Sequence, residues 1–154
     1  MGAGPRSIRR RANWLNLSTP AGLLLTALSG ARPRRTPDGF YVATGYRWAV
    51  PMAGAFTVGD VIVTRQRREG ADPTSPLAQQ VWEHEKRHAA QYACLGLLFI
   101  PAYVAAAGYS WAVGGDAWSY NVFETRADLA DGGYIKAELR PMARLVSNRL
   151  RRRG

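Results

Sequence analysis

The chain has 154 residues, a length typical of one domain with a short tail at each end. Hydrophobic residues make up 47% of it, so the chain can form a packed core, and its composition is not that of a generally disordered protein. The formal net charge is +10, and arginines clustered in residues 6–11 and 149–153 carry most of it. Such clusters suit an anionic membrane surface or nucleic acid, or are simply solvated tails. The absence of a nucleic-acid motif, together with several apolar stretches, favours a membrane surface.

The sequence predicts a tail, a short apolar segment and a linker in the first part of the chain. Residues 1–13 are rich in glycine and arginine and are expected to be mobile. Residues 14–28 are apolar, with a helix-start signal at residues 18–20. This segment is too short to span a bilayer with certainty, and its flanks resemble a signal peptide. A helix that lies on a membrane or packs in the core is preferred over cleavage and secretion. Residues 32–39 are predicted to be a turn-rich linker.

The middle of the chain has the pattern of a small sheet. Residues 40–44, 46–50 and 56–64 are rich in β-branched and aromatic side chains, and glycine or proline separates them. We therefore predict a small antiparallel meander. A polar loop is expected from residue 66 to Pro76, where a long helix begins.

That helix contains the motif that organises the sequence, His84-Glu85-Lys86-Arg87-His88. Two histidines four residues apart lie on one helical face and can present their imidazoles to a single zinc ion. Glu85 projects beside that face, where a carboxylate can take a proton from a metal-bound water. These are the only two histidines in the chain. The alternative without a metal site is that both histidines lie on the surface of a charged helix.

After the motif, residues 89–115 contain no charged side chain. The stretch is long enough to be a transmembrane candidate, but Gly96, Pro101 and Gly108 argue against one smooth span. Embedding in a membrane and burial in a compact core both remain open. Cys94, the single cysteine, excludes an internal disulfide, and its apolar neighbours predict that it is buried.

A third metal ligand is needed, because a catalytic zinc usually has three protein ligands. Glu124 is the preferred ligand, on a helix predicted for residues 121–134, and Asp116 is the alternative. Asp128, four residues after Glu124, is expected to accept a hydrogen bond from a ligating imidazole and so orient it. Residues 135–154 are predicted to form a basic amphipathic helix interrupted at Pro141.

The pair His84–His88 and Glu124-Thr125-Arg126-Ala127-Asp128 resembles the HExxH…ExxAD motifs of gluzincin metallopeptidases. The arrangement is most similar to the membrane-associated HtpX-like group, and the chain also resembles small actinobacterial proteins. The strand pattern at residues 57–63 is similar to gluzincin-like domains in which such a strand pairs with an extended substrate. Whether residues 61–64 do so here is open. The chain departs from the larger members in size and lacks an obvious substrate-binding subdomain.

The resemblance implies an α+β, gluzincin-like fold: a β-meander, a metal-site helix, an apolar hairpin or segment, and a second metal-site helix. It implies Zn²⁺ held by His84, His88 and Glu124, with Glu85 as the general base for peptide-bond hydrolysis. Tyr134, Tyr120 or Arg126 would stabilise the oxyanion. The expected domains are 1–31, 32–134 and 135–154.

The expected partners are a peptide or protein substrate and an anionic membrane surface, with no specific nucleic acid. The expected location is the cytoplasmic face of a bacterial inner membrane, or the cytoplasm. Two other functions stay open. One is a non-catalytic, zinc-stapled module that binds a protein. The other is a basic adaptor at a membrane surface, without metal.

Overall fold

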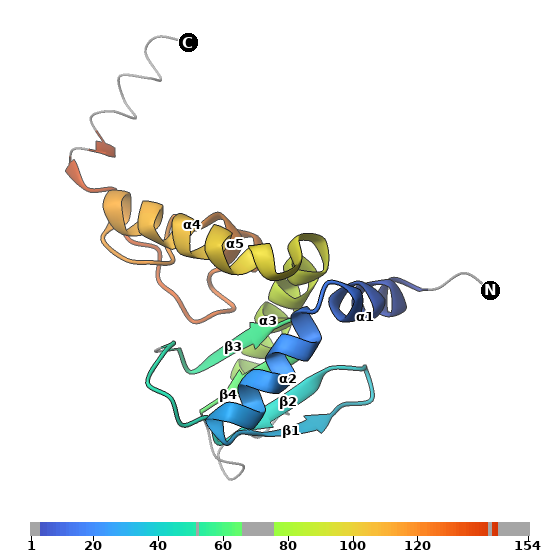
Figure 1. The fold of residues 1–154 in the computed structure, drawn as a ribbon. Helices are drawn as coiled ribbons and strands as arrows, with labels where there is room; N and C mark the ends of the chain where they lie inside the picture. The colour runs from blue at the N-terminus through green and yellow to red at the C-terminus, as the bar shows by residue number, and fades with distance from the viewer. Residues whose placement is uncertain (1–3, 52, 66–75, 142, 145–154) are drawn as a thin grey trace. The chain divides into compact units, whose positions relative to one another are not determined.

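The computed structural model describes residues 4–51, 53–65, 76–141 and 143–144 (Figure 1). The chain divides into two compact units, Met1–Phe99 and Ile100–Gly154. Helices and one small sheet make the protein α+β, as the sequence predicted. The sequence-based division at residues 31 and 134 stays a prediction.

The sheet of the first unit has four strands in the order β1-β2-β4-β3. The strands are β1 (Arg32–Arg35), β2 (Tyr41–Thr44), β3 (Ala55–Val58) and β4 (Val61–Thr64). Strand β2 pairs in parallel with β4, and the other two pairings are antiparallel. The predicted all-antiparallel meander is therefore wrong. The chain leaves β2 and forms β3 at the edge of the sheet. It then turns back, so that β4 lies between β2 and β3.

Three local predictions in this region also fail. The expected linker contains β1, an edge strand whose four exposed residues include Pro33, a residue tolerated at an edge. Residues 46–50 form a loop, closed by the Tyr46 hydroxyl donating to the Val50 carbonyl at 2.5 Å. Residues 56–64 are not one strand, because Gly59 turns the chain with φ of 62°.

Strand β4 is the centre of the core, because its alternate side chains serve both faces of the sheet. Val61 and Val63 are fully buried on the face covered by helix α2 (Ser18–Ser29), in a cluster with Ala43. Ile62 points to the other face and packs in a cluster with Ala89 of helix α3 (Pro76–Leu95). Figure 1 shows the two helices on opposite sides of the sheet. The motif helix thus packs on the sheet against β4 and, more extensively, against β3.

Helix α1 (Pro5–Leu15) packs against α3 through polar side chains. The buried Asn13 amide donates to the Asp60 carboxylate at 2.9 Å and to the Ala89 carbonyl at 3.0 Å. Asn16 donates to the Tyr92 carbonyl at 2.9 Å. The expectation of a mobile residue 1–13 segment is therefore wrong for Pro5 onward. Composition misled here, because the buried face of α1 is polar instead of apolar.

The uncharged segment after the motif is helical but broken. It comprises the end of α3, a short 3₁₀ helix η1 (Gly96–Leu98) and α4 (Phe99–Gly114), with Gly96 at φ of 59°. Among the described residues, Ala78–Gly114 is the one helical stretch long and apolar enough to cross a membrane, judged by length and composition alone. Cys94 is exposed, contrary to prediction, because it lies on the face of α3 away from the sheet cluster.

The second unit contains α4 from Ile100 onward and the short helix α5 (Val122–Arg126). The predicted helix over residues 121–134 is wrong, because Asp128 adopts the left-handed conformation with φ of 68° and turns follow it. Residues 135–140 are not helical either, against the prediction of a basic helix from 135. Residues 141, 143 and 144 are helical, and the rest of that predicted helix lies outside the described residues.

Candidate metal centre

Helix α3 brings the two histidines of the motif together on its buried face. His84 is 3% exposed and His88 is 6% exposed. Their Nε2 atoms lie 3.1 Å apart, and the rings are nearly perpendicular, at 84°. Two nitrogens bound tetrahedrally to one zinc ion, each at about 2.0–2.1 Å, are about 3.3–3.4 Å apart. The histidine pair therefore fits two positions of a tetrahedral metal site with almost no rearrangement.

Gln91, one turn after His88, sets which nitrogen of that ring carries the proton. The His88 Nδ1 atom lies 2.9 Å from the Gln91 side-chain oxygen. An amide oxygen only accepts, so Nδ1 is the donor and the neutral ring presents its Nε2 lone pair toward His84. This is the tautomer that a metal ligand requires when the other ring nitrogen donates. The sequence analysis missed Gln91, although a hydrogen-bonding side chain three residues from a histidine on a helix is a readable signal.

Glu85 is buried beside the histidines, at 5% exposure, and β3 holds it. The Thr57 hydroxyl lies 2.7 Å from Glu85 Oε2 and 3.2 Å from the Glu85 main-chain carbonyl, both within reach as acceptors. A hydrogen bond to the carboxylate fixes its direction on the helix. Nothing in the sequence singled out Thr57, because the contact depends on where β3 lies against α3.

Tyr92 extends this buried face of α3 by one turn beyond His88. It is 3% exposed and packs against Phe99, with ring centroids 4.3 Å apart. Burial, and secondly the negative charge of Glu85, raise the pKa of the Tyr92 hydroxyl. The hydroxyl therefore stays protonated at physiological pH.

Glu124 lies in the first turn of α5, and residues of its own unit hold it. Asn121 caps this helix, because its side-chain oxygen accepts from the Phe123 amide at 3.0 Å. The Tyr103 hydroxyl of α4 donates to Glu124 Oε1. The side chain is 2% exposed. A carboxylate so buried and so oriented has the character of a metal ligand's side chain.

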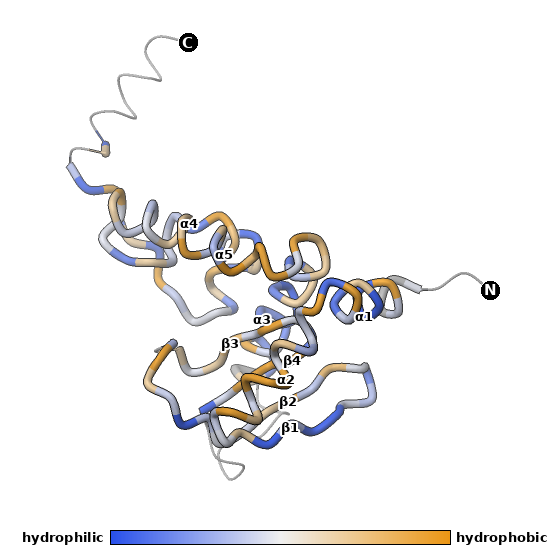
Figure 2. The backbone as a smooth tube through the Cα atoms, in the orientation of Figure 1, coloured by the Kyte–Doolittle hydropathy of each residue, from blue (hydrophilic) through white to orange (hydrophobic). Residues whose placement is uncertain are grey.

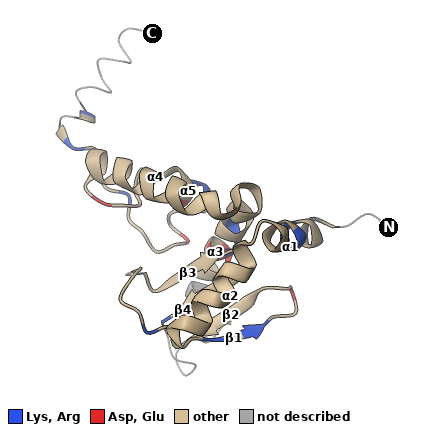
Figure 3. Cartoon of the chain, viewed as in Figure 1, with Lys and Arg blue, Asp and Glu red and all other residues tan. Residues whose placement is uncertain are grey.

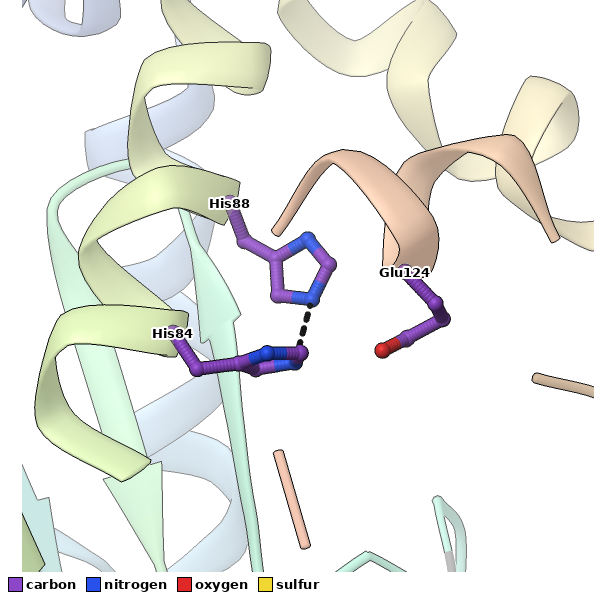
Figure 4. A group of neighbouring side chains, drawn as sticks. All are labelled: His84, His88 and Glu124. Atoms are coloured by element: carbon purple, nitrogen blue, oxygen red, sulfur yellow. Dashed lines mark hydrogen bonds between the residues drawn. The ribbon is translucent and has the colours of Figure 1, made fainter. Parts of the chain in front are cut away.

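His84, His88 and Glu124 form a buried group that could hold a metal ion (Figure 4). Each offers one ligand atom, and these atoms lie within 4.8 Å of one another. Two imidazole nitrogens and one carboxylate oxygen are a donor set that suits zinc.

Asp116, the alternative ligand, has a different role. Its carboxylate accepts from the Trp118 amide at 2.9 Å and from the amide and hydroxyl of Ser119, both at 2.6 Å. Burial alone would raise its pKa, but these hydrogen bonds outweigh burial and lower the pKa. Asp116 therefore closes the turn between α4 and α5.

Asp128 does not lie on the helical face that the sequence analysis assumed, because α5 ends at Arg126. Its side chain is exposed, and Oδ1 accepts from the Ala130 amide at 3.3 Å. Its role in orienting an imidazole remains a prediction. The helical spacing from Glu124 that motivated this prediction is absent.

The three oxyanion candidates are placed as follows. The Tyr120 hydroxyl donates to the Ala137 carbonyl at 2.8 Å, Tyr134 stacks on Trp118 at 5.1 Å, and Arg126 is exposed. The choice among these candidates stays open.

The strand considered for substrate pairing, residues 61–64, is β4, which has β2 on one side and β3 on the other. Both of its edges are used, so it cannot accept an extended peptide. In the described sheet, β3 is the edge strand next to α3.

No protein-family model, curated protein or solved structure matches the chain.

Proposed function

We propose that the protein is a zinc-dependent hydrolase of the HExxH type that cleaves peptide bonds, with a gluzincin-like arrangement of its site. One observation carries the proposal: a buried carboxylate, Glu85, lies on the same helix as two histidines whose Nε2 atoms converge to 3.1 Å. The proposed ligands are His84, His88 and Glu124.

The buried carboxylate favours catalysis over a purely structural zinc site. A structural site uses four protein ligands and has no need of a base beside them. Burying a carboxylate is costly unless it is compensated, and here the compensation includes the Thr57 hydroxyl. The arrangement keeps Glu85 beside the histidines instead of turning it to solvent.

A zinc ion held there would act as a Lewis acid that makes a water molecule more acidic and polarises a substrate carbonyl. The side chains of the protein do the rest. Glu85 would take a proton from the attacking water and later deliver it to the leaving amine. Gln91 would keep the His88 proton on Nδ1, and Tyr103 would hold the Glu124 carboxylate in one orientation. The roles of Gln91 and Tyr103 rest on hydrogen bonds that the structure contains.

The proposed substrate is a peptide or protein in extended conformation. Strand β3 supports this, because it packs on the motif helix and pairs with β4 alone among the described strands. Main-chain groups of an edge strand can pair with a substrate backbone.

A zinc-stapled module that binds a protein partner is the second candidate. The burial of all three ligands is as consistent with this module as with the hydrolase. The buried carboxylate of Glu85 argues against the module, because a structural site needs no base. A basic adaptor that binds no metal is the third, and the net charge of +10 motivates it.

Zinc analysis of purified variants tests these candidates. The wild-type protein should contain about one zinc per chain. His84→Ala should lose the metal, whereas Glu85→Gln should retain both metal and fold and lose hydrolysis of a peptide library by a factor of about 10² to 10⁴. Zinc retained by the His84→Ala/His88→Ala double variant would refute the site. Hydrolysis that survives in Glu85→Gln would refute the catalytic role.

A further inference from the structure

Helix α2 packs Leu23 and Leu25 partly buried against the core cluster, yet it turns its other two leucines outward. Its buried residues are small or hydroxyl-bearing: Ser18, Thr19, Gly22, Thr26 and Ser29. Its large residues Leu24 and Leu28 are 60% and 63% exposed. In a water-soluble helix the apolar side chains face the core and the polar ones face solvent.

Gly22 and Thr19 on the buried face of α2 allow the helix to pack closely on the sheet. A Cβ atom at Gly22 would lie 2.5 Å from the Val58 carbonyl oxygen, so only glycine allows the helix to approach the sheet so closely. The Thr19 hydroxyl accepts from the Asp60 amide at 3.1 Å. Close approach through small residues, with Leu24 and Leu28 turned outward, is a packing pattern of helices whose outer face contacts lipid.

Leu17, between α1 and α2, is another leucine that is exposed to solvent. Its φ of 66° lies in the left-handed region, which costs free energy for a leucine and favours glycine or asparagine. The side chain is nevertheless 59% exposed, so contacts within the fold return little of that cost. Leu24 and Leu28 lie one turn apart on the outer side of α2, and Leu17 directly precedes the helix. We call these three residues the leucine face.

Arginines border the leucine face at both ends. The outer side of α1 carries the exposed Arg10 and Arg11 one turn before the exposed Trp14 and Leu15, while Arg9 and Asn13 face inward to Asp60. After α2, the exposed strand β1 carries Arg32, Arg34 and Arg35. Figure 2 shows the apolar course of α2, and Figure 3 shows that α2 lacks charge whereas α1 and β1 carry blue segments.

We propose that the leucine face is a docking surface for a lipid bilayer that contains anionic headgroups. The leucines enter the boundary between headgroups and acyl chains, where their exposed area leaves water. The arginines of α1 and β1 pair with the anionic headgroups, as the charge complementarity requires. The inference is independent of the metal centre, since it rests on α1, α2 and β1 alone.

A fluorophore placed on the surface tests the proposal in the full chain. Cys94 is exposed, so Cys94→Ser provides a background for single labels. Leu28→Cys carries an environment-sensitive dye, and Val50→Cys, at another exposed apolar position, is the matched control. The protein is mixed with phosphatidylcholine vesicles with or without phosphatidylglycerol. The label at position 28 should brighten and shift to the blue on anionic vesicles, and a lipid-borne quencher should quench it, while the control label stays in water.

Three further variants separate the contributions. Arg10→Gln/Arg11→Gln should reduce the signal on anionic vesicles, and added salt should do the same to the parent protein. Leu24→Gln should weaken the signal about tenfold or more. Leu17→Asn should weaken it while keeping or raising the melting temperature, because asparagine tolerates a positive φ.

The proposal is overturned if the label at position 28 stays in water on every vesicle. It is also overturned if the label is sheltered without lipid as protein concentration rises, because a second copy of the chain then covers the face. A loss of thermal stability in Leu17→Asn would show that this leucine serves the fold and would remove it from the surface.

Discussion

The Thr57 hydroxyl of β3 lies 2.7 Å from the Glu85 carboxylate of α3, so an edge strand orients the proposed catalytic base. Thr57→Val removes this donor and leaves a buried carboxylate oxygen with one partner fewer. We expect a loss of about 1–3 kcal/mol in unfolding free energy and at least about tenfold in any hydrolytic rate. Thr57→Ser should restore both. Denaturant unfolding and peptide hydrolysis measure the two effects, and a Thr57→Val protein with unchanged activity would remove Thr57 from the mechanism.

Gln91 offers a test of the tautomer argument. Gln91→Leu should lower zinc affinity about 10–100-fold, because the His88 Nδ1 proton loses its acceptor. Gln91→Glu, which still accepts, should retain affinity. Competition with a chromogenic chelator measures the change, and Gln80→Leu, at an exposed position of the same helix, is the control. Equal affinities for Gln91→Leu and Gln80→Leu would contradict the assignment.

Glu124 and Tyr103 should act on the metal as a pair. Glu124→Ala should lower zinc affinity and, because metal binding adds to folding stability, the melting temperature of the zinc-loaded protein. Tyr103→Phe should reproduce part of the affinity loss, about tenfold, since the carboxylate loses its orienting donor. Calorimetric titration with zinc provides the affinities. Arg126→Ala, on the exposed side of the same short helix, should bind zinc like the parent.

The raised pKa of the Asp60 carboxyl predicts how the unfolding free energy changes with pH. Burial raises its pKa above the ordinary 3.8, against the opposing effects of the Asn13 hydrogen bond and the charges of Arg9 and Arg10. A raised folded-state pKa means that the folded chain binds the proton more tightly than the unfolded chain. The contribution of Asp60 is therefore fully present below the unfolded pKa and is lost as pH rises through the folded pKa.

Asp60→Asn keeps an acceptor for Asn13 and removes the titration. Over the range from about pH 4 upward, the unfolding free energy of the parent should fall relative to that of the variant. Urea unfolding across pH measures this difference. A parallel course of the two curves would mean that the Asp60 pKa is not raised.

The local chemistry of the site could be predicted from the sequence, whereas the contacts that support it could not. Histidines four apart on a helix must share a face, which placed His84 and His88, and the motif spacing suggested Glu124. Asp128 was assigned by assuming that the helix continued, but the chain turns there with a positive φ.

The supporting contacts depend on tertiary packing. Thr57 and Tyr103 meet their partners only through packing of elements, so no local pattern marks them. The prediction of the sheet failed for a related reason. Strand β1 consists of arginines and a proline, which are not typical of strands. The order in which strands pair depends on long-range contacts and not on the propensity of each strand.

The hydrogen bonds from α1 to α3 also constrain the order in which the chain can fold. Asn13 and Asn16 are synthesised early, yet their acceptors, the carbonyls of Ala89 and Tyr92, follow 76 residues later. Contacts of such long separation form late and slowly, because the intervening loop must be closed first. Until α3 has been synthesised, the Asn13 and Asn16 amides therefore lack two of the acceptors that they have in the folded protein. Helix α1 is therefore made first, but it can complete its docking only after α3 has emerged.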